Sequence, residues 1–112
     1  MRFAIPIADN KLTLHFGHSA EFAIVDADEE KKQIQMREDV DAPPHQPGLL
    51  PRWLAERGVN VIIAGGIGQR AQALFLEQGI RVLVGAPCDT PEHLIISYLR
   101  GALISGTNVC DH

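Results

Sequence analysis

The sequence lacks the features that mark membrane, secreted and nucleic-acid-binding proteins. It has two cysteines, and no apolar run approaches the roughly 18 to 20 residues that a membrane-spanning helix needs. Two cysteines are too few for the disulfide framework of a small secreted domain, and the amino terminus turns polar too early for a signal peptide. The ten basic residues are scattered along a chain of net charge −4, which argues against binding to nucleic acid. We therefore expect a cytoplasmic protein without a membrane or nucleic-acid partner.

What the sequence does contain is typical of one folded domain. Hydrophobic residues make up 46% of the chain and charged residues 21%, so disorder and coiled coil are poor descriptions. A chain of 112 residues has room for one hydrophobic core, and we predict a single domain over residues 1–112. Residues 102–112 show no periodic pattern and are predicted to form a mobile tail.

Hydrophobic periodicity predicts five strands and three helices. Strands are predicted over residues 2–8, 21–26, 31–38, 59–64 and 80–84. The last two are almost continuously apolar, which is typical of strands covered on both faces. Helices are predicted from residue 49 to the glycine at position 58, over residues 69–78, and from residue 91 onward behind the cap Thr90. An antiparallel hairpin followed by two parallel crossovers gives a three-layer α/β/α domain with a five-stranded mixed sheet in the order 3-2-1-4-5.

This topology brings two loops to one crevice. In open α/β sheets a ligand binds beyond the carboxyl ends of the strands, where successive connections leave in opposite directions. Here that position lies between the first and fourth predicted strands. The loops after them carry two histidines, His15 and His18, and a glycine turn over residues 65–68. The crevice is therefore the predicted binding site.

The glycine turn is the first candidate element of that site. Gly65, Gly66 and Gly68 permit backbone conformations that are closed to other residues, and they let a ligand approach the main chain. The helix that follows offers free N–H groups to an anion, and Arg70 adds a positive charge. The alternative is that these glycines only make a tight turn from strand to helix.

Four residues are candidate metal ligands. His15 and His18 lie three residues apart, close enough to ligate one metal through neutral imidazoles, although two ligands do not complete a site. Cys110 and His112 add a thiol and an imidazole in the tail, and ten extended residues span about 33 Å, enough to return to this crevice or to that of a neighbouring subunit. The alternatives are surface histidines and a frayed terminus with a bystander cysteine. If all four residues converge, they would close a tetrahedral zinc site.

Three further residues with metal-binding side chains are assigned to structural roles. Cys88 follows the last predicted strand, where it would be a third soft donor, but we interpret it as a small core residue. His45 lies between prolines, and His93 lies on the last predicted helix. Both histidines are predicted to be surface residues.

Two competing functions have weaker support. A nucleotide-binding site is one, because a Gly-x-Gly-x-x-Ala motif follows a strand and Asp89 comes about 20 residues later. A nuclease is the other, and it needs carboxylates that converge on magnesium. The only plausible pair, Asp9 and Asp26, is predicted at opposite edges of the sheet, so we discount nuclease activity.

A family pattern runs through nearly the whole chain. It is carried by HFGHSAEFAIVD, VIIAGGIGQRA and GIRVLVGAP, together with the IPIADN opening and the loop around His45. In these stretches the sequence resembles the dinitrogenase iron-molybdenum cofactor biosynthesis family, which is related to nitrogen fixation. The resemblance implies a chain path similar to that of ribonuclease H.

The resemblance also implies a function. It points to a non-enzymatic carrier or chaperone for an iron–sulfur or iron–molybdenum–sulfur cluster, held transiently, with His15 as the leading contact and His18 beside it. Because such a cluster is an anion, the histidines, the helix N-terminus and Arg70 would serve one purpose. Two cysteines cannot supply the four thiolates of a ferredoxin, so binding should be weak enough for transfer. The expected partners are proteins that donate and accept the cluster, and the protein itself is expected to be a monomer or a weak homodimer.

Overall fold

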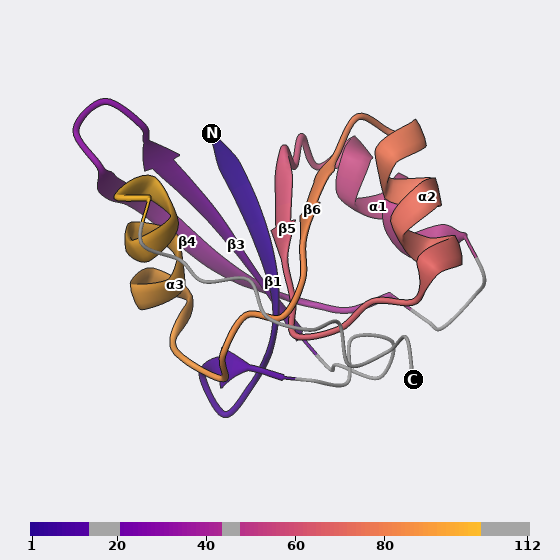
Figure 1. Cartoon of the computed structure of the whole chain (residues 1–112), viewed down its shortest axis with the longest axis horizontal. Coiled ribbons are helices and arrows are strands. Elements are labelled where there is room, and N and C mark those ends of the chain that lie inside the picture. The colour runs from indigo at the N-terminus through magenta and orange to yellow at the C-terminus, as the bar shows by residue number, and fades with distance from the viewer. Residues whose placement is uncertain (14–20, 44–47, 102–112) are drawn as a thin grey trace.

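The computed structural model describes residues 1–13, 21–43 and 48–101 of the chain (Figure 1). In chain order its elements are β1 (Arg2–Ala8), β2 (Lys11–Leu12), β3 (Glu21–Asp28), β4 (Gln33–Asp41), α1 (Leu49–Glu56), β5 (Val61–Ile63), α2 (Gln69–Glu77), β6 (Arg81–Leu83) and α3 (Pro91–Leu99). The strand predicted over residues 2–8 has these same bounds, the other predicted strands and helices are present with shifted boundaries, and β2 is an addition. Among the helices that the structure describes, none is long and apolar enough to cross a membrane.

The strands of the described residues form one mixed sheet. Its path is β4-β3-β1-β5-β6, and the short β2 pairs with β1 alone. With β2 left out, this path reads 3-2-1-4-5 in chain order. Strand β1 runs antiparallel to β3 and parallel to β5, and β5 runs parallel to β6. The carboxyl ends of β1, β5 and β6 therefore meet at one edge. The likeness to ribonuclease H stays a prediction.

Helices cover both faces of this sheet. Successive residues of β1 alternate between the faces, so Phe3 packs beneath α3 whereas Ala4 faces α1 and α2. The cluster on the α3 side includes Ile95, and the cluster on the other side includes Phe22 and Phe75. Burying each large side chain contributes about 1.5–3 kcal/mol, so the two clusters hold the three layers together.

Helix ends follow the predicted caps. Gly58 and Gly79 stand just beyond α1 and α2, both with φ of 76°. This left-handed conformation suits glycine and stops a helix. Thr90 caps α3, because its Oγ1 accepts the His93 N–H at 3.4 Å, and Pro91 begins the helix.

The two outer strands differ in part from their predictions. Strand β6 is covered on both faces, as predicted, because Leu83 packs against the cluster on the α3 side and Val82 packs against the other cluster. Its burial is incomplete, since it ends the sheet and pairs with one strand only. Strand β4 continues past residue 38 to Asp41 because its pairing with β3 extends to Glu21. A bulge beside Asp26 and several charged side chains protect this outer strand from pairing with another chain.

Candidate functional site

The candidate site lies where β1, β5 and β6 end, in the lower part of Figure 1. We call this region the carboxyl edge, and its described residues are 8–13, 64–70 and 84–90. The loop after β5 and the loop after β6 lie next to each other there, since the two strands are parallel neighbours. This is the arrangement in which open α/β sheets bind ligands.

Thr13 and Glu21 are the described residues on either side of positions 14–20. On one side, the Thr13 N–H donates to the Pro6 carbonyl at 3.0 Å, so the chain leaves beside the end of β1. On the other side, Glu21 begins β3 and pairs with Ile7. Both described residues that flank this segment therefore lie at the carboxyl edge.

The glycine turn after β5 is held against the loop after β6. The Gly85 N–H donates to the Gly65 carbonyl at 2.9 Å, and both Gly65 and Gly66 are buried. Positive φ angles in the described residues occur at other glycines, and Gly68 has an ordinary φ of −60°. Gly65, Gly66 and Gly68 therefore do not use the left-handed conformations that glycine permits.

Gly68 instead leaves open space beside the start of α2. It is the N-cap residue of that helix, and a Cβ added to it would meet no atom within 4 Å. The first N–H groups of a helix have no partner within the helix, and they favour an anion. Gln69 and Arg70 are exposed in this first turn. Gly68 is therefore exposed, with open space beside it.

Asp89 ties the loop after β6 to strand β2. Its carbonyl accepts the Leu12 N–H at 2.9 Å. Its carboxylate accepts the Thr90 N–H at 2.7 Å and contacts His93 Nδ1 at 2.5 Å. The Thr90 hydrogen bond, followed by the His93 contact and the charge of Lys11, lowers the pKa of Asp89. Because this carboxylate is occupied within the protein, it is poorly placed to bind the ribose hydroxyl that the nucleotide interpretation requires.

Arg37 on β4 also reaches the carboxyl edge. Its guanidinium donates to Asn10 Oδ1 and Glu92 Oε2, each at 2.6 Å, and to the Asp39 carboxylate at 2.8 and 3.1 Å. Asp39 first, and then Glu92, raise the pKa of Arg37, so it stays charged. Sequence reasoning missed this residue, because residues 31–38 were predicted only to form a strand.

Cys88 is exposed in the loop after β6, so its interpretation as a core residue is wrong. Pro87 beside it is also exposed. His93 is exposed, as predicted. Within residues 1–13, 21–43 and 48–101, no three side chains of His, Cys, Asp or Glu come together to hold a metal ion. The predicted ligands His15, His18, Cys110 and His112, and also His45, lie outside these described residues.

The two candidate nuclease carboxylates lie at opposite edges, as predicted. Asp9 follows β1 at the carboxyl edge, whereas Asp26 pairs with Arg2 where β1 begins. The Arg2 Nε to Asp26 Oδ1 distance is 2.7 Å. The two carboxylates therefore cannot share a magnesium ion.

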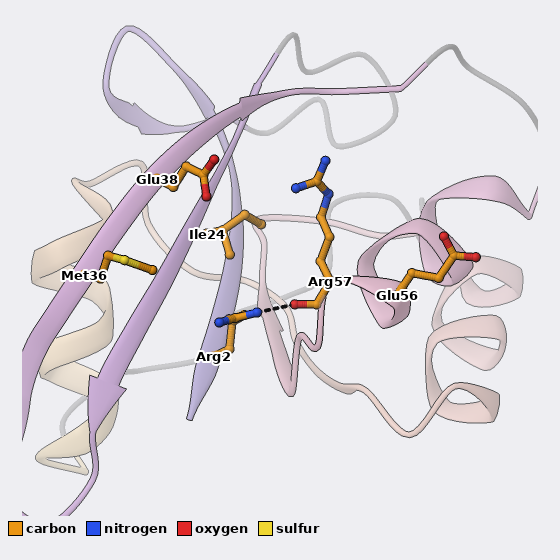
Figure 2. Close-up of a pocket in the computed structure, with 6 residues that line it drawn as sticks. All are labelled: Arg2, Ile24, Met36, Glu38, Glu56 and Arg57. Atoms are coloured by element: carbon orange, nitrogen blue, oxygen red, sulfur yellow. Dashed lines mark hydrogen bonds between the residues drawn. The ribbon is translucent and has the colours of Figure 1, made fainter.

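A groove lies at the other edge of the sheet, where β1 begins. Its volume is about 260 Å³, and it is lined by Arg2, Ile24, Met36, Glu38, Glu56 and Arg57. Figure 2 shows the Arg2 guanidinium bonded to the Arg57 carbonyl across this groove. Two arginines and two glutamates leave the lining without net charge, so the groove is poorly matched to an anion.

Comparison with known proteins agrees with the pattern seen in the sequence. A family model described as dinitrogenase iron-molybdenum cofactor matches residues 1–101. The chain belongs to this family. An uncharacterized protein of Methanocaldococcus jannaschii is 36% identical over 108 residues, which make up 92% of this chain and 89% of the relative. The family resemblance is confirmed.

Two solved structures have the same fold. The crystal structure of PH0822 has a TM-score of 0.84 and 30% identity, and the match covers 94% of each chain. The apo form of the orange protein from Desulfovibrio gigas has a TM-score of 0.72 and 21% identity, over 96% of this chain and 93% of that one. The second likeness concerns the fold alone.

Proposed function

We propose that this protein is a non-enzymatic carrier that binds an iron–sulfur or iron–molybdenum–sulfur cluster at the carboxyl edge and passes it on. The observation that carries the proposal is the position of Thr13 and Glu21, which flank residues 14–20 at the edge where α2 begins. His15 and His18 belong to a short segment between these two residues. Their proposed role is to ligate iron in the cluster.

The start of α2 supports an anionic cargo. A metal–sulfur cluster carries negative charge on its sulfides, and helix N–H groups donate to such atoms. Gly65, Gly66 and Gly68 are the proposed contacts for the cluster through their main chain, with Arg70 as a nearby positive charge. The open space beside Gly68 gives a large ligand room to approach.

The small number of thiols supports transfer instead of permanent storage. A ferredoxin holds its cluster through four thiolates, whereas this chain has two cysteines. In the proposal, Cys110 and His112 complete the ligand set from the tail. The partners are then a protein that supplies the cluster and a protein that accepts it, and the carrier works as a monomer or a weak homodimer.

Anaerobic reconstitution tests this function. The full chain is incubated with ferrous iron and sulfide, with or without molybdate, and then desalted and analysed for metal and sulfide. We expect a brown protein whose visible absorbance is lost in His15→Ala and kept in His45→Ala, the matched histidine that is predicted to lie outside the site. Cluster binding by His15→Ala equal to that of the parent would show that the loop assignment is wrong.

Two further readouts separate the alternatives. Stoichiometric zinc in protein purified anaerobically, together with no cluster uptake, would instead support a small zinc-binding domain. Cluster binding through imidazoles should also weaken below about pH 6, because protons compete for the ring nitrogens.

A further inference from the structure

The β1–β2 hairpin is joined at two points of the carboxyl edge to the segment formed by α3 and the loop before it. One is the hydrogen bond from the Leu12 N–H to the Asp89 carbonyl, at 2.9 Å. The other runs through the Arg37 guanidinium, which contacts Asn10 in the turn and Glu92 in the first turn of α3, at 2.6 Å each. The turn leads directly through β2 to Thr13 and so to residues 14–20.

We propose that Arg37 is a positioning residue for the candidate cluster site, because it fixes the β1–β2 turn against α3 and so holds the point where the chain enters residues 14–20. The inference rests on the proposed function, since it affects binding only if His15 and His18 are ligands. Arg37 touches no cargo in this arrangement. It acts through the turn.

The geometry at Arg37 requires a guanidinium. Asp39 lies two residues along the same strand and accepts from both Nε and Nη2, which fixes the plane of the group. The fixed plane aims Nη1 at Glu92 and Nη2 at Asn10. A lysine ammonium has no such fork and cannot reach three partners in one plane. The side chain is 20% exposed, so these contacts are better shielded than those of a surface ion pair.

A substitution at Asn10 can remove its hydrogen bond with Arg37 without straining the backbone. Its φ is 65°, a left-handed conformation that asparagine, aspartate and glycine tolerate well. Asn10→Gly removes the acceptor oxygen and keeps the turn. Asn10→Asp keeps an acceptor for Arg37 and serves as the matched rescue variant.

Arg81 is the control for a general weakening of α3. It lies on β6 and donates to the Tyr98 hydroxyl at 2.9 Å, near the far end of the same helix. Arg81→Gln therefore removes a tether of α3 that does not reach the β1–β2 turn.

The experiment titrates the full chain anaerobically with cobalt(II), whose absorption reports ligation by imidazole and thiolate. We expect Asn10→Gly and Arg37→Gln to weaken cobalt binding about tenfold, as loss of a group that orients metal ligands does. Asn10→Asp and Arg81→Gln should stay within about twofold of the parent on the same scale. In the metal-free protein, amide hydrogen exchange at Leu12 and Thr13 should be faster in the first two variants only.

Each outcome decides a different point. Parental cobalt affinity in Asn10→Gly, or equal losses in Asn10→Gly and Asn10→Asp, would overturn the positioning role and leave the proposed function standing. A parent protein that takes up neither cobalt nor cluster would contradict the proposed function. In that case the exchange rates still test whether Arg37 fixes the turn. Unchanged amide exchange at Leu12 and Thr13 in Asn10→Gly would overturn this role. Faster exchange there would support it.

Discussion

Arg70 and Gly68 at the carboxyl edge differ from the arginine and glycines at the other edge, although Arg37 at the carboxyl edge is also ion-paired and Gly85 there also has a φ of 76°. At the edge where β1 begins, Arg2 binds Asp26 on β3 and the Arg57 carbonyl beyond α1, and the glycines that end α1 and α2 have left-handed φ angles. Figure 2 shows part of this closed arrangement. At the carboxyl edge, Gly68 has an ordinary φ and open space around it, and Arg70 is exposed.

This contrast separates residues that the fold requires from residues that it does not. The glycines and the arginine pairing at the first edge are explained by turns, helix ends and an ion pair. At the carboxyl edge, neither backbone conformation nor packing requires glycine at position 68 or an exposed Cys88. Function is therefore expected at the carboxyl edge.

The hydrophobic core supports both edges of the sheet, so a substitution in the core should have the largest effect on the free energy of unfolding. Phe75 on α2 is fully buried, so Phe75→Ala should lower the free energy of unfolding by about 3–5 kcal/mol. Leu76 is next to it and 64% exposed, and Leu76→Ala should change the free energy by less than about 0.5 kcal/mol. Urea denaturation measures both. Similar losses in the two variants would contradict the packing of α2 described above.

Arg2 tests the first edge. Arg2→Met removes the ion pair with Asp26 and the bond to the Arg57 carbonyl, and it should lower the free energy of unfolding by about 1–2 kcal/mol, because solvent partly screens these contacts. Cluster uptake per folded protein should equal that of the parent. Loss of cluster uptake in folded Arg2→Met would contradict the assignment of cluster binding to the carboxyl edge alone.

Two glycine substitutions compare the edges directly. Gly79→Ala forces alanine into a φ of 76° and should lower the free energy of unfolding by about 1 kcal/mol. Gly68→Ala meets neither strain nor a clash, so stability should fall by only about 0.5 kcal/mol, because alanine is a poorer N-cap than glycine, while the added methyl group reduces cluster uptake. Thermal melts and metal analysis of both variants test this. Cluster uptake by Gly68→Ala equal to that of the parent would show that Gly68 is not part of the site.

Acid should destabilise the folded protein through one carboxylate at each edge, and by less than the substitutions above. The Arg2 hydrogen bond lowers the pKa of Asp26, and the Thr90 N–H lowers that of Asp89. A carboxylate with a lower pKa in the folded state stabilises the protein above its unfolded pKa of about 4, and this stability is lost as pH falls through the folded pKa. Urea midpoints at pH 6 and pH 3 should therefore differ less in Asp26→Asn than in the parent. An unchanged difference would contradict the role of this pair.

Local signals explain which parts of the fold could be predicted. Gly58, Gly79 and Thr90 act within one turn of the helices that they cap, so their roles are visible in the sequence. The half-exposed state of β6 depends on its place in the sheet, which apolar periodicity does not report.

Topology made the carboxyl edge predictable. Thr13 and the glycine turn both lie there because β1 and β5 are parallel neighbours. The contacts of Arg37 join residues 27 and 55 positions apart, and no spacing rule marks them. The exposure of Cys88 depends on how one loop bends, which its neighbours in sequence do not reveal.

The most direct test compares amide hydrogen exchange in the cluster-loaded and cluster-free protein. If the carboxyl edge holds the cargo, loading should slow exchange at residues 11–13, 65–70 and 86–90 and leave residues 33–38 and 56–58 unchanged. Protection confined to residues 33–38 and 56–58, around the groove of Figure 2, would contradict binding at the carboxyl edge.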